Sequence, residues 1–274
     1  YVHTERSLSE LTRVIGKMLG VAKGLGAEQF VGICTAAFRK ATNGAKYLAG
    51  LCEQTGVRLK IVTQQQEALL GFATASSVAG DLAEHEIVAW DSGGGSFQVT
   101  GEWDGETHTW MRPVGSGVAT AELVKGVMGK DFSQCPTPNP VSVTQAQGLA
   151  ARLKKAIGPP PQWLTTKLAI RHVKLVGIGG DMSIFRLAEE LCGKAVLTAP
   201  DVLLAVENMC GKTDRDLRTL EGVPAAQKMP HNVIPKLVLL YVVLDLTGAE
   251  AVDFRQCNGN LPGVFVSEDL WEGL

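Results

Sequence analysis

Three strand-like runs, separated only by short turns between residues 87 and 114, constrain the fold most strongly. The runs are "IVAW" (87–90), "SFQVTGEWDG" (96–105) and "THTWMRPV" (107–114). Helical patterns follow at 117–128 and 142–157, and residues 173–193 have the pattern of a strand, a glycine turn and a helix. This half of the chain therefore has the order βββ-α-β-α. The sequence after residue 193 predicts at least three more helices, near 200–210, 212–220 and 234–247.

The first part of the chain has the same order without its opening strands. Helices are expected at 7–28, 36–56 (with a break at Asn43-Gly44) and 64–80, and strands at 30–35 and 57–63. Two α/β lobes of one pattern, with a ligand between them, are typical of the sugar kinase, Hsp70 and actin type of fold. We therefore assign residues 1–84 to a first lobe and 85–274 to a second lobe with C-terminal helices. We also expect an opening βββ unit, with its own glycine turn, to precede Tyr1.

Composition narrows the class of protein. The 274 residues are 45% hydrophobic and carry a formal net charge of −2, which is typical of a globular protein and gives no support for a nucleic-acid surface. The longest apolar run, 234–248, contains Pro235, Lys236 and Asp245 and is shorter than the ~20 residues of a membrane span. Six scattered cysteines without a CxxC pair indicate thiols in a reducing compartment. We expect a cytoplasmic protein.

The stretch "DSGGGS" (91–96) places three glycines directly after a strand. Glycine lets backbone approach a ligand closely and frees N–H groups to bind an anion. No Lys-Ser/Thr pair follows, so this is not a P-loop, and the next segment is a strand rather than the helix of a dinucleotide site. The prediction is a phosphate-binding hairpin, with a plain glycine hairpin as the alternative. Its expected residues are Asp91 for Mg²⁺, directly or through water, and Gly93, Gly94, Gly95 and Ser96 for phosphate oxygens.

Three further features are candidates for the same site. "GIGG" (177–180) offers the backbone of Gly179 and Gly180 to a phosphate or nucleotide, or packs a helix tightly onto a strand. Arg39 follows a strand and can bind phosphate bidentately, although a surface arginine is the plain alternative. Glu67 also follows a strand, where it can orient or deprotonate an attacking water unless it is simply a solvated charge.

Taken in order, these segments resemble the exopolyphosphatase/guanosine pentaphosphate phosphohydrolase (Ppx/GppA) family. The matching segments are "CTAAFRKATNG", "GVRLKIVTQQQEALLGF", "IVAWDSGGGSFQV", "RPVGSGVATAEL" and "VKLVGIGGDMS". The resemblance implies a two-lobed, actin-like ATPase fold and Mg²⁺-dependent hydrolysis of terminal phosphoanhydride bonds in polyphosphate or pppGpp. It places Arg39 on the family's phosphate-binding arginine and Glu67 on its catalytic glutamate. It places Asp91 and the glycines on the second phosphate motif. Because family members are often dimers, the resemblance also implies a homodimer.

The chain departs from the family pattern at several points. The first phosphate loop, of the type D-x-G-S-N-S, is missing together with the opening strands. The block E-E-A-R is Gln66-Glu67-Ala68-Leu69, and the glutamate that ends the second motif is Gln98, which weakens the expected metal site. The segment "NGNLPGVF" (258–265) stands where the family has an arginine-glycine segment.

The mechanism that follows is attack by water, with Glu67 as the base and Arg39 as a fixed positive charge. Three alternatives stay open. A sensor that binds a phosphate ligand without cleaving it is favoured by Gln98, Leu69 and the missing loop. A kinase or ATPase of the same fold would bind its nucleotide near 177–180. A structural lobe would pair the exposed edge of its first sheet with another chain.

Overall fold

The computed structural model describes residues 2 and 4–267 and divides into two compact units between Glu67 and Ala68. This division falls inside helix α4 (Gln64–Val78), which the sequence assigned as a whole to the first lobe. The reason lies in packing, because Phe72 and Ala75 of α4 join an apolar cluster with strands of the second unit.

The first unit contains a small parallel sheet and the helices that precede, connect and follow its strands. Its elements are α1 (Glu5–Gly24), β1 (Val31–Cys34), α2 (Ala36–Lys40), α3 (Gly44–Thr55), β2 (Arg58–Ile61) and the first turn of α4. Strands β1 and β2 pair in parallel, with Val31 opposite Arg58. The expected helix break is present at Gly44, where a Cβ atom would lie 2.2 Å from the carbonyl oxygen of Phe38. Gly56 ends α3 in the left-handed conformation, with φ +71°.

The second unit is built on a six-stranded sheet in the order β5-β4-β3-β6-β8-β7. Its strands are β3 (Ile87–Ser92), β4 (Phe97–Trp103), β5 (Glu106–Arg112), β6 (Lys174–Gly179), β7 (Val196–Leu197) and β8 (Val252–Gln256). The first three form the predicted antiparallel run, and β3, β6 and β8 are mutually parallel. The carboxyl ends of β3 and β6, which carry the two glycine-rich segments, therefore lie next to each other.

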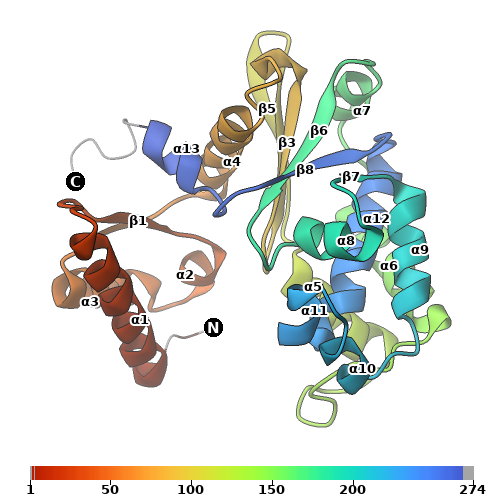
Figure 1. Ribbon diagram of the computed structural model, residues 1–274, viewed down its shortest axis with the longest axis horizontal. Coiled ribbons are helices and arrows are strands. Elements are labelled where there is room, and N and C mark those ends of the chain that lie inside the picture. The colour runs from red at the N-terminus through yellow and green to blue at the C-terminus, as the bar shows by residue number, and fades with distance from the viewer. Residues whose placement is uncertain (1, 3, 268–274) are drawn as a thin grey trace. The chain divides into compact units, whose positions relative to one another are not determined.

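Side chains of β3 alternate between two apolar layers. Ile87 and Ala89 pack against α4, whereas Val88 and Trp90 belong to the large core under the helices of the other face. Figure 1 shows α4 and α13 on one side of this sheet and α8, α9 and α12 on the other. The helices of this unit are η1 (Glu84–Glu86), α5 (Ser116–Ala121), η2 (Glu122–Val127), α6 (Val143–Ile157), α7 (Gln162–Leu168), α8 (Ile184–Cys192), α9 (Ala199–Met209), α10 (Asp214–Arg218), α11 (Pro224–Lys228), η3 (Pro230–Asn232), α12 (Val233–Thr247) and α13 (Leu261–Val266).

Among the elements that were not predicted from the sequence are α7, β7, β8 and α13. The proline run 159–161 hides the start of α7, because Pro161 is the N-cap of a helix that the prolines seemed to exclude. The other three are short and depend on long-range packing, as at Gly263 of α13, where a Cβ atom would lie 2.1 Å from the carbonyl oxygen of Leu70 in α4. Within residues 4–267, no helix has the length and apolar character needed to cross a membrane.

Candidate active site

The three-glycine turn between β3 and β4 is closed by a hydrogen bond from Gly93 N–H to the Ser96 carbonyl, at 3.0 Å. The carbonyls of Gly93 and Gly94 accept hydrogen bonds from Ser116 N–H at 3.0 Å and Gly117 N–H at 2.9 Å, at the start of α5. Both carbonyl oxygens are therefore turned toward α5. The N–H group of Gly94 has no acceptor within the described part of the chain, so it is available to an anion.

Gly115, just before α5, permits this contact. A Cβ atom at this position would lie 2.4 Å from the carbonyl oxygen of Gly93 and 2.5 Å from the carbonyl carbon of Gly94. No side chain fits at such a distance without moving the turn. Sequence reasoning did not select Gly115 as a site residue, although the segment "RPVGSGVATAEL" already belonged to the resemblance.

The second glycine-rich segment combines both roles that the sequence left open. Gly177 and Gly179 are packing residues, because Cβ atoms there would lie 2.7 Å from the ring of Phe185 and 2.5 Å from Cβ of Ser183. The turn that follows, from Gly180 to Met182, leaves three successive backbone N–H groups without an acceptor among residues 4–267. Consecutive free N–H groups in a turn form a site suited to an anion.

The two turns line one cavity of about 320 Å³ at the carboxyl ends of β3 and β6. Ligands of α/β proteins gather at this end of a parallel sheet. Five predicted residues lie around this cavity, namely Asp91, Gly93, Gly94, Gly179 and Gly180.

Ser96 and Gly95, which the sequence also predicted to bind phosphate, are not among the residues that line this cavity. The Ser96 side chain is buried, and its Oγ accepts a hydrogen bond from Gln98 Nε2 at 3.3 Å. Gln98 is only 2% exposed and lies opposite Asp91 in the β3–β4 register. The amide therefore occupies a buried position beside the acidic residue, where it adds no negative charge.

Asp91 has a neighbour that sequence reasoning did not identify as part of the site. Asn260 Nδ2 donates a hydrogen bond of 3.1 Å to Asp91 Oδ2, although the two residues are far apart in the chain. The amide oxygen of Asn260, Oδ1, is buried without a hydrogen-bond partner in the described residues, and so is Ser92 Oγ. One carboxylate with unsatisfied neutral oxygens fits Mg²⁺, which commonly binds through one or two carboxylates plus substrate phosphates and water. No group of three or more His, Cys, Asp or Glu side chains suited to a metal occurs in the described residues.

The first unit brings together the two remaining predicted residues. Arg39 of α2 and Glu67 of α4 form an ion pair, with Nη2 2.6 Å from Oε2, and both side chains are largely buried. Arg39 Nη1 also donates a hydrogen bond of 2.9 Å to the carbonyl of Val62, just after β2. The hydrogen bond to Val62 fixes the guanidinium, whose charge lies against the carboxylate, although Glu67 Oε2 makes no hydrogen bond within the described residues.

Comparisons with known proteins agree with the motifs. A model of the Ppx/GppA phosphatase family matches residues 2–130. Exopolyphosphatase 1 of Mycobacterium leprae is 30% identical over 120 residues, which are 43% of this chain and 35% of that protein. Exopolyphosphatase 1 of Mycobacterium tuberculosis is 26% identical over 245 residues, which are 86% of this chain and 66% of that protein. Residues 2–130 of the chain therefore resemble the Ppx/GppA phosphatase family.

The fold is that of Ppx/GppA crystal structures. The exopolyphosphatase from Cytophaga hutchinsonii superimposes with a TM-score of 0.73 at 14% identity, covering 97% of this chain and 83% of that chain. The predicted α/β fold class is confirmed.

One departure from the Ppx/GppA pattern has a structural explanation. Gln66 stands at the first acidic position of the E-E pair, and it closes a capping box at the start of α4. Its Oε1 accepts a hydrogen bond of 2.9 Å from Thr63 N–H, and Thr63 Oγ1 accepts one of 3.1 Å from Gln66 N–H. Glutamine and glutamate both serve at this position of the motif. The substitution therefore keeps the helix start that presents Glu67.

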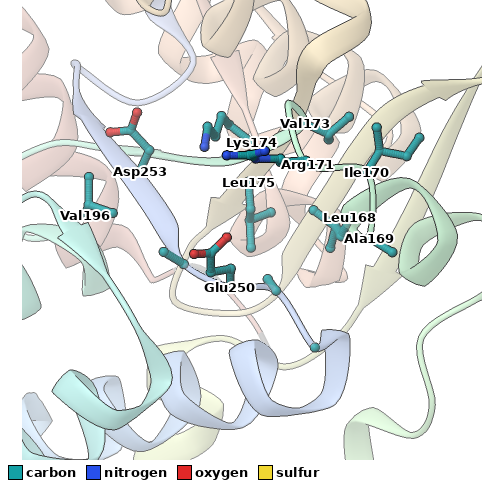
Figure 2. A pocket seen from close by; sticks show the side chains of 13 residues that line it. Leu168, Ala169, Ile170, Arg171, Val173, Lys174, Leu175, Val196, Glu250 and Asp253 are labelled. Carbon is teal, nitrogen blue, oxygen red and sulfur yellow. The ribbon is translucent and has the colours of Figure 1, made fainter.

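A second cavity of about 380 Å³ lies at the opposite, amino ends of β6 and β8 (Figure 2). Its charged lining residues are Arg171, Lys174, Glu250 and Asp253. None of the predicted site residues lines this cavity, and Asp253 is already paired with Arg255 at 2.9 Å. We therefore place the candidate site at the smaller cavity beside the glycine turns.

Proposed function

We propose that the chain hydrolyses the terminal phosphoanhydride bond of inorganic polyphosphate, with Mg²⁺. The second proposed substrate is pppGpp, a guanosine nucleotide that carries the same kind of terminal bond. The observation that carries the proposal is the convergence of two turns on one cavity beside the carboxylate of Asp91. Their N–H groups at Gly94 and from Gly180 to Met182 have no other acceptor within residues 4–267. Such a surface binds the oxygens of an anion without carrying a full charge of its own.

In this proposal Glu67 and Arg39, which form an ion pair, act on the terminal phosphate. Glu67 accepts a proton from water as the water oxygen attacks the terminal phosphorus. The bond from that phosphorus to the bridging oxygen breaks, and the shortened phosphate chain leaves with the electron pair. Arg39 has five N–H donors, of which one is engaged by the Val62 carbonyl, while Nη2 lies 2.6 Å from Glu67 Oε2. The remaining donors can bind the oxygens on which negative charge develops.

Asp91 and Asn260 would hold the metal ion through the Asp91 carboxylate and the buried Oδ1 of Asn260. The ion would neutralise phosphate charge and orient the chain of phosphates. Asp91→Asn removes the only full charge that this pair contributes. The variant should therefore need a higher Mg²⁺ concentration for half-maximal activity.

A phosphate sensor is the second candidate, and one observation favours it. Gln98 supplies an amide beside Asp91, so the described residues offer a single carboxylate at this position. A site of this kind can bind a phosphate ligand with Mg²⁺ weakly and leave its phosphoanhydride bond intact.

Phosphate release from polyphosphate with Mg²⁺ separates the two candidates. The full chain should release phosphate, and Glu67→Gln should release at least about 10²-fold less while its circular dichroism spectrum is unchanged. Undiminished release by Glu67→Gln would contradict the role of Glu67. Binding of polyphosphate by the unaltered chain with no release at all would favour the sensor.

A further inference from the structure

Lys236, in the first turns of α12, is a buried lysine beside the candidate site. Its side chain is only 4% exposed, and its Nζ donates a hydrogen bond of 2.7 Å to the carbonyl of Met182. Met182 lines the phosphate cavity, whereas Lys236 does not. The Met182 carbonyl is thus turned away from the cavity, toward α12.

The charge of Lys236 is not balanced by an ion pair. No carboxylate in the described residues lies within 4.0 Å of its Nζ, and the nearby Glu190 is paired with Arg186 at 2.9 Å instead. Burying an ammonium group without a paired anion is costly, so a protein seldom keeps one without a compensating use. A phosphate bound in the adjoining cavity would add a negative charge on the other side of the turn.

The hydrogen bond to Met182 also acts on the turn itself. A backbone carbonyl pointing into the cavity would repel phosphate oxygens. With this carbonyl held by Lys236, the turn from Gly180 to Met182 presents N–H groups whose acceptors are absent from residues 4–267. Charge behind such a turn strengthens its attraction for an anion, because interactions in a protein interior are weakly screened.

We propose that Lys236 is a positioning residue for phosphate, which holds the Met182 carbonyl out of the cavity and places a positive charge behind the Gly180–Met182 turn. This inference rests on the proposed phosphate-binding function of the cavity. It adds a residue that belongs to none of the sequence motifs.

Lys167 in α7 provides a matched control. It is also 4% exposed, and its Nζ donates to two backbone carbonyls, those of His85 at 2.8 Å and Glu102 at 2.6 Å. None of these three residues lines the phosphate cavity. Replacing either lysine therefore removes a buried ammonium group and its hydrogen bonds to backbone carbonyls, but only Lys236→Met alters the turn at the cavity.

The test is calorimetric titration of the full chain with methylenediphosphonate and Mg²⁺, since the P–C–P bridge of this probe cannot be hydrolysed. Lys236→Met should weaken binding by about tenfold or more, and Lys167→Met should change it by less than about twofold. Circular dichroism and unfolding temperature are recorded for each variant, and Lys236→Gln replaces Lys236→Met should the latter fail to fold.

Two outcomes would overturn the inference while leaving the proposed function intact. One is a Lys236 variant that binds the diphosphonate as tightly as the unaltered chain. The other is an equal loss of affinity in Lys167→Met, which would indicate a general effect of removing a buried lysine. Should the unaltered chain bind no diphosphonate, the proposed function of the cavity would fail, and the role of Lys236 with it.

Discussion

Arg39 and Glu67 are in direct contact, with the guanidinium Nη2 2.6 Å from the carboxylate Oε2. The sequence assigned these residues separate roles, one for phosphate and one for water, and the structure makes them a single unit. Any change in Arg39 must therefore also change the orientation of the proposed base.

Replacing Arg39 by lysine tests this coupling. A lysine keeps the charge but cannot reach both Glu67 and the Val62 carbonyl with two arms of one planar group. We expect Arg39→Lys to lower kcat by about tenfold and Arg39→Ala by about 10²-fold or more, with smaller changes in KM. Steady-state phosphate release from tripolyphosphate measures both constants. A lysine variant with unaltered kcat would show that the charge alone suffices.

The capping box of α4 predicts opposite effects for two substitutions of one residue. Gln66→Ala removes the acceptor for Thr63 N–H and should lower the free energy of unfolding by about 1 kcal/mol. Gln66→Glu keeps that acceptor and places a negative charge at a helix N-terminus, so it should be neutral or stabilising. Urea unfolding of the two variants gives the comparison. Equal stability of Gln66→Ala and the unaltered chain would mean that the box contributes nothing.

Gly115→Ala should damage both stability and phosphate binding. The added methyl group would lie 2.4 Å from the Gly93 carbonyl oxygen, so the glycine turn or α5 must move, at a cost of about 1–3 kcal/mol. Gly50→Ala in α3 is the control, since a Cβ atom there has nothing within 4 Å and a helical alanine is stabilising. Thermal unfolding and diphosphonate titration of both variants test the prediction. A Gly115→Ala protein that matches Gly50→Ala in both measurements would refute the close contact.

The stability difference between the unaltered chain and Lys236→Met should depend on pH. Burial lowers the pKa of Lys236 to about 8 from an ordinary value of 10.5. The side chain therefore still carries its proton at pH 7. Between about pH 8 and 10.5 the folded state releases this proton while the unfolded state keeps it. The unfolded state then binds more protons, and the contribution of Lys236 to stability improves as pH rises.

Urea unfolding at several pH values between 7 and 10 checks this sign. The free energy of unfolding of the unaltered chain minus that of Lys236→Met should increase above pH 8, since other titrating groups are common to both proteins. A difference that stays flat across this range would indicate that Lys236 has an ordinary pKa.

Local patterns predicted much of the architecture, because they depend on neighbours in the sequence. The period of apolar residues located α6 closely, the longest apolar run located α12, and the run of short strands located β3, β4 and β5. The same reasoning placed Arg39 and Glu67 just after strands of the first unit. Their ion pair joins residues 28 positions apart (67 − 39), and no local pattern predicts such a contact.

The features that complete the candidate site are the ones that local patterns cannot supply. Asn260 reaches Asp91 from 169 residues along the chain, and Lys236 reaches Met182 from 54 residues away. Gly115 matters only because α5 packs onto the glycine turn. The segment 258–265 was recognised as a departure from the family, but its role beside Asp91 depends on the tertiary fold.

A crystal structure of the full chain with methylenediphosphonate and Mg²⁺ tests the central claim most directly. We predict phosphonate oxygens in the cavity between the two glycine turns, within hydrogen-bond distance of the Gly94 N–H and of the N–H groups from Gly180 to Met182. Asp91 should lie at the metal ion. Diphosphonate bound instead at the amino ends of β6 and β8, beside Arg171 and Lys174, would contradict the assignment of the site.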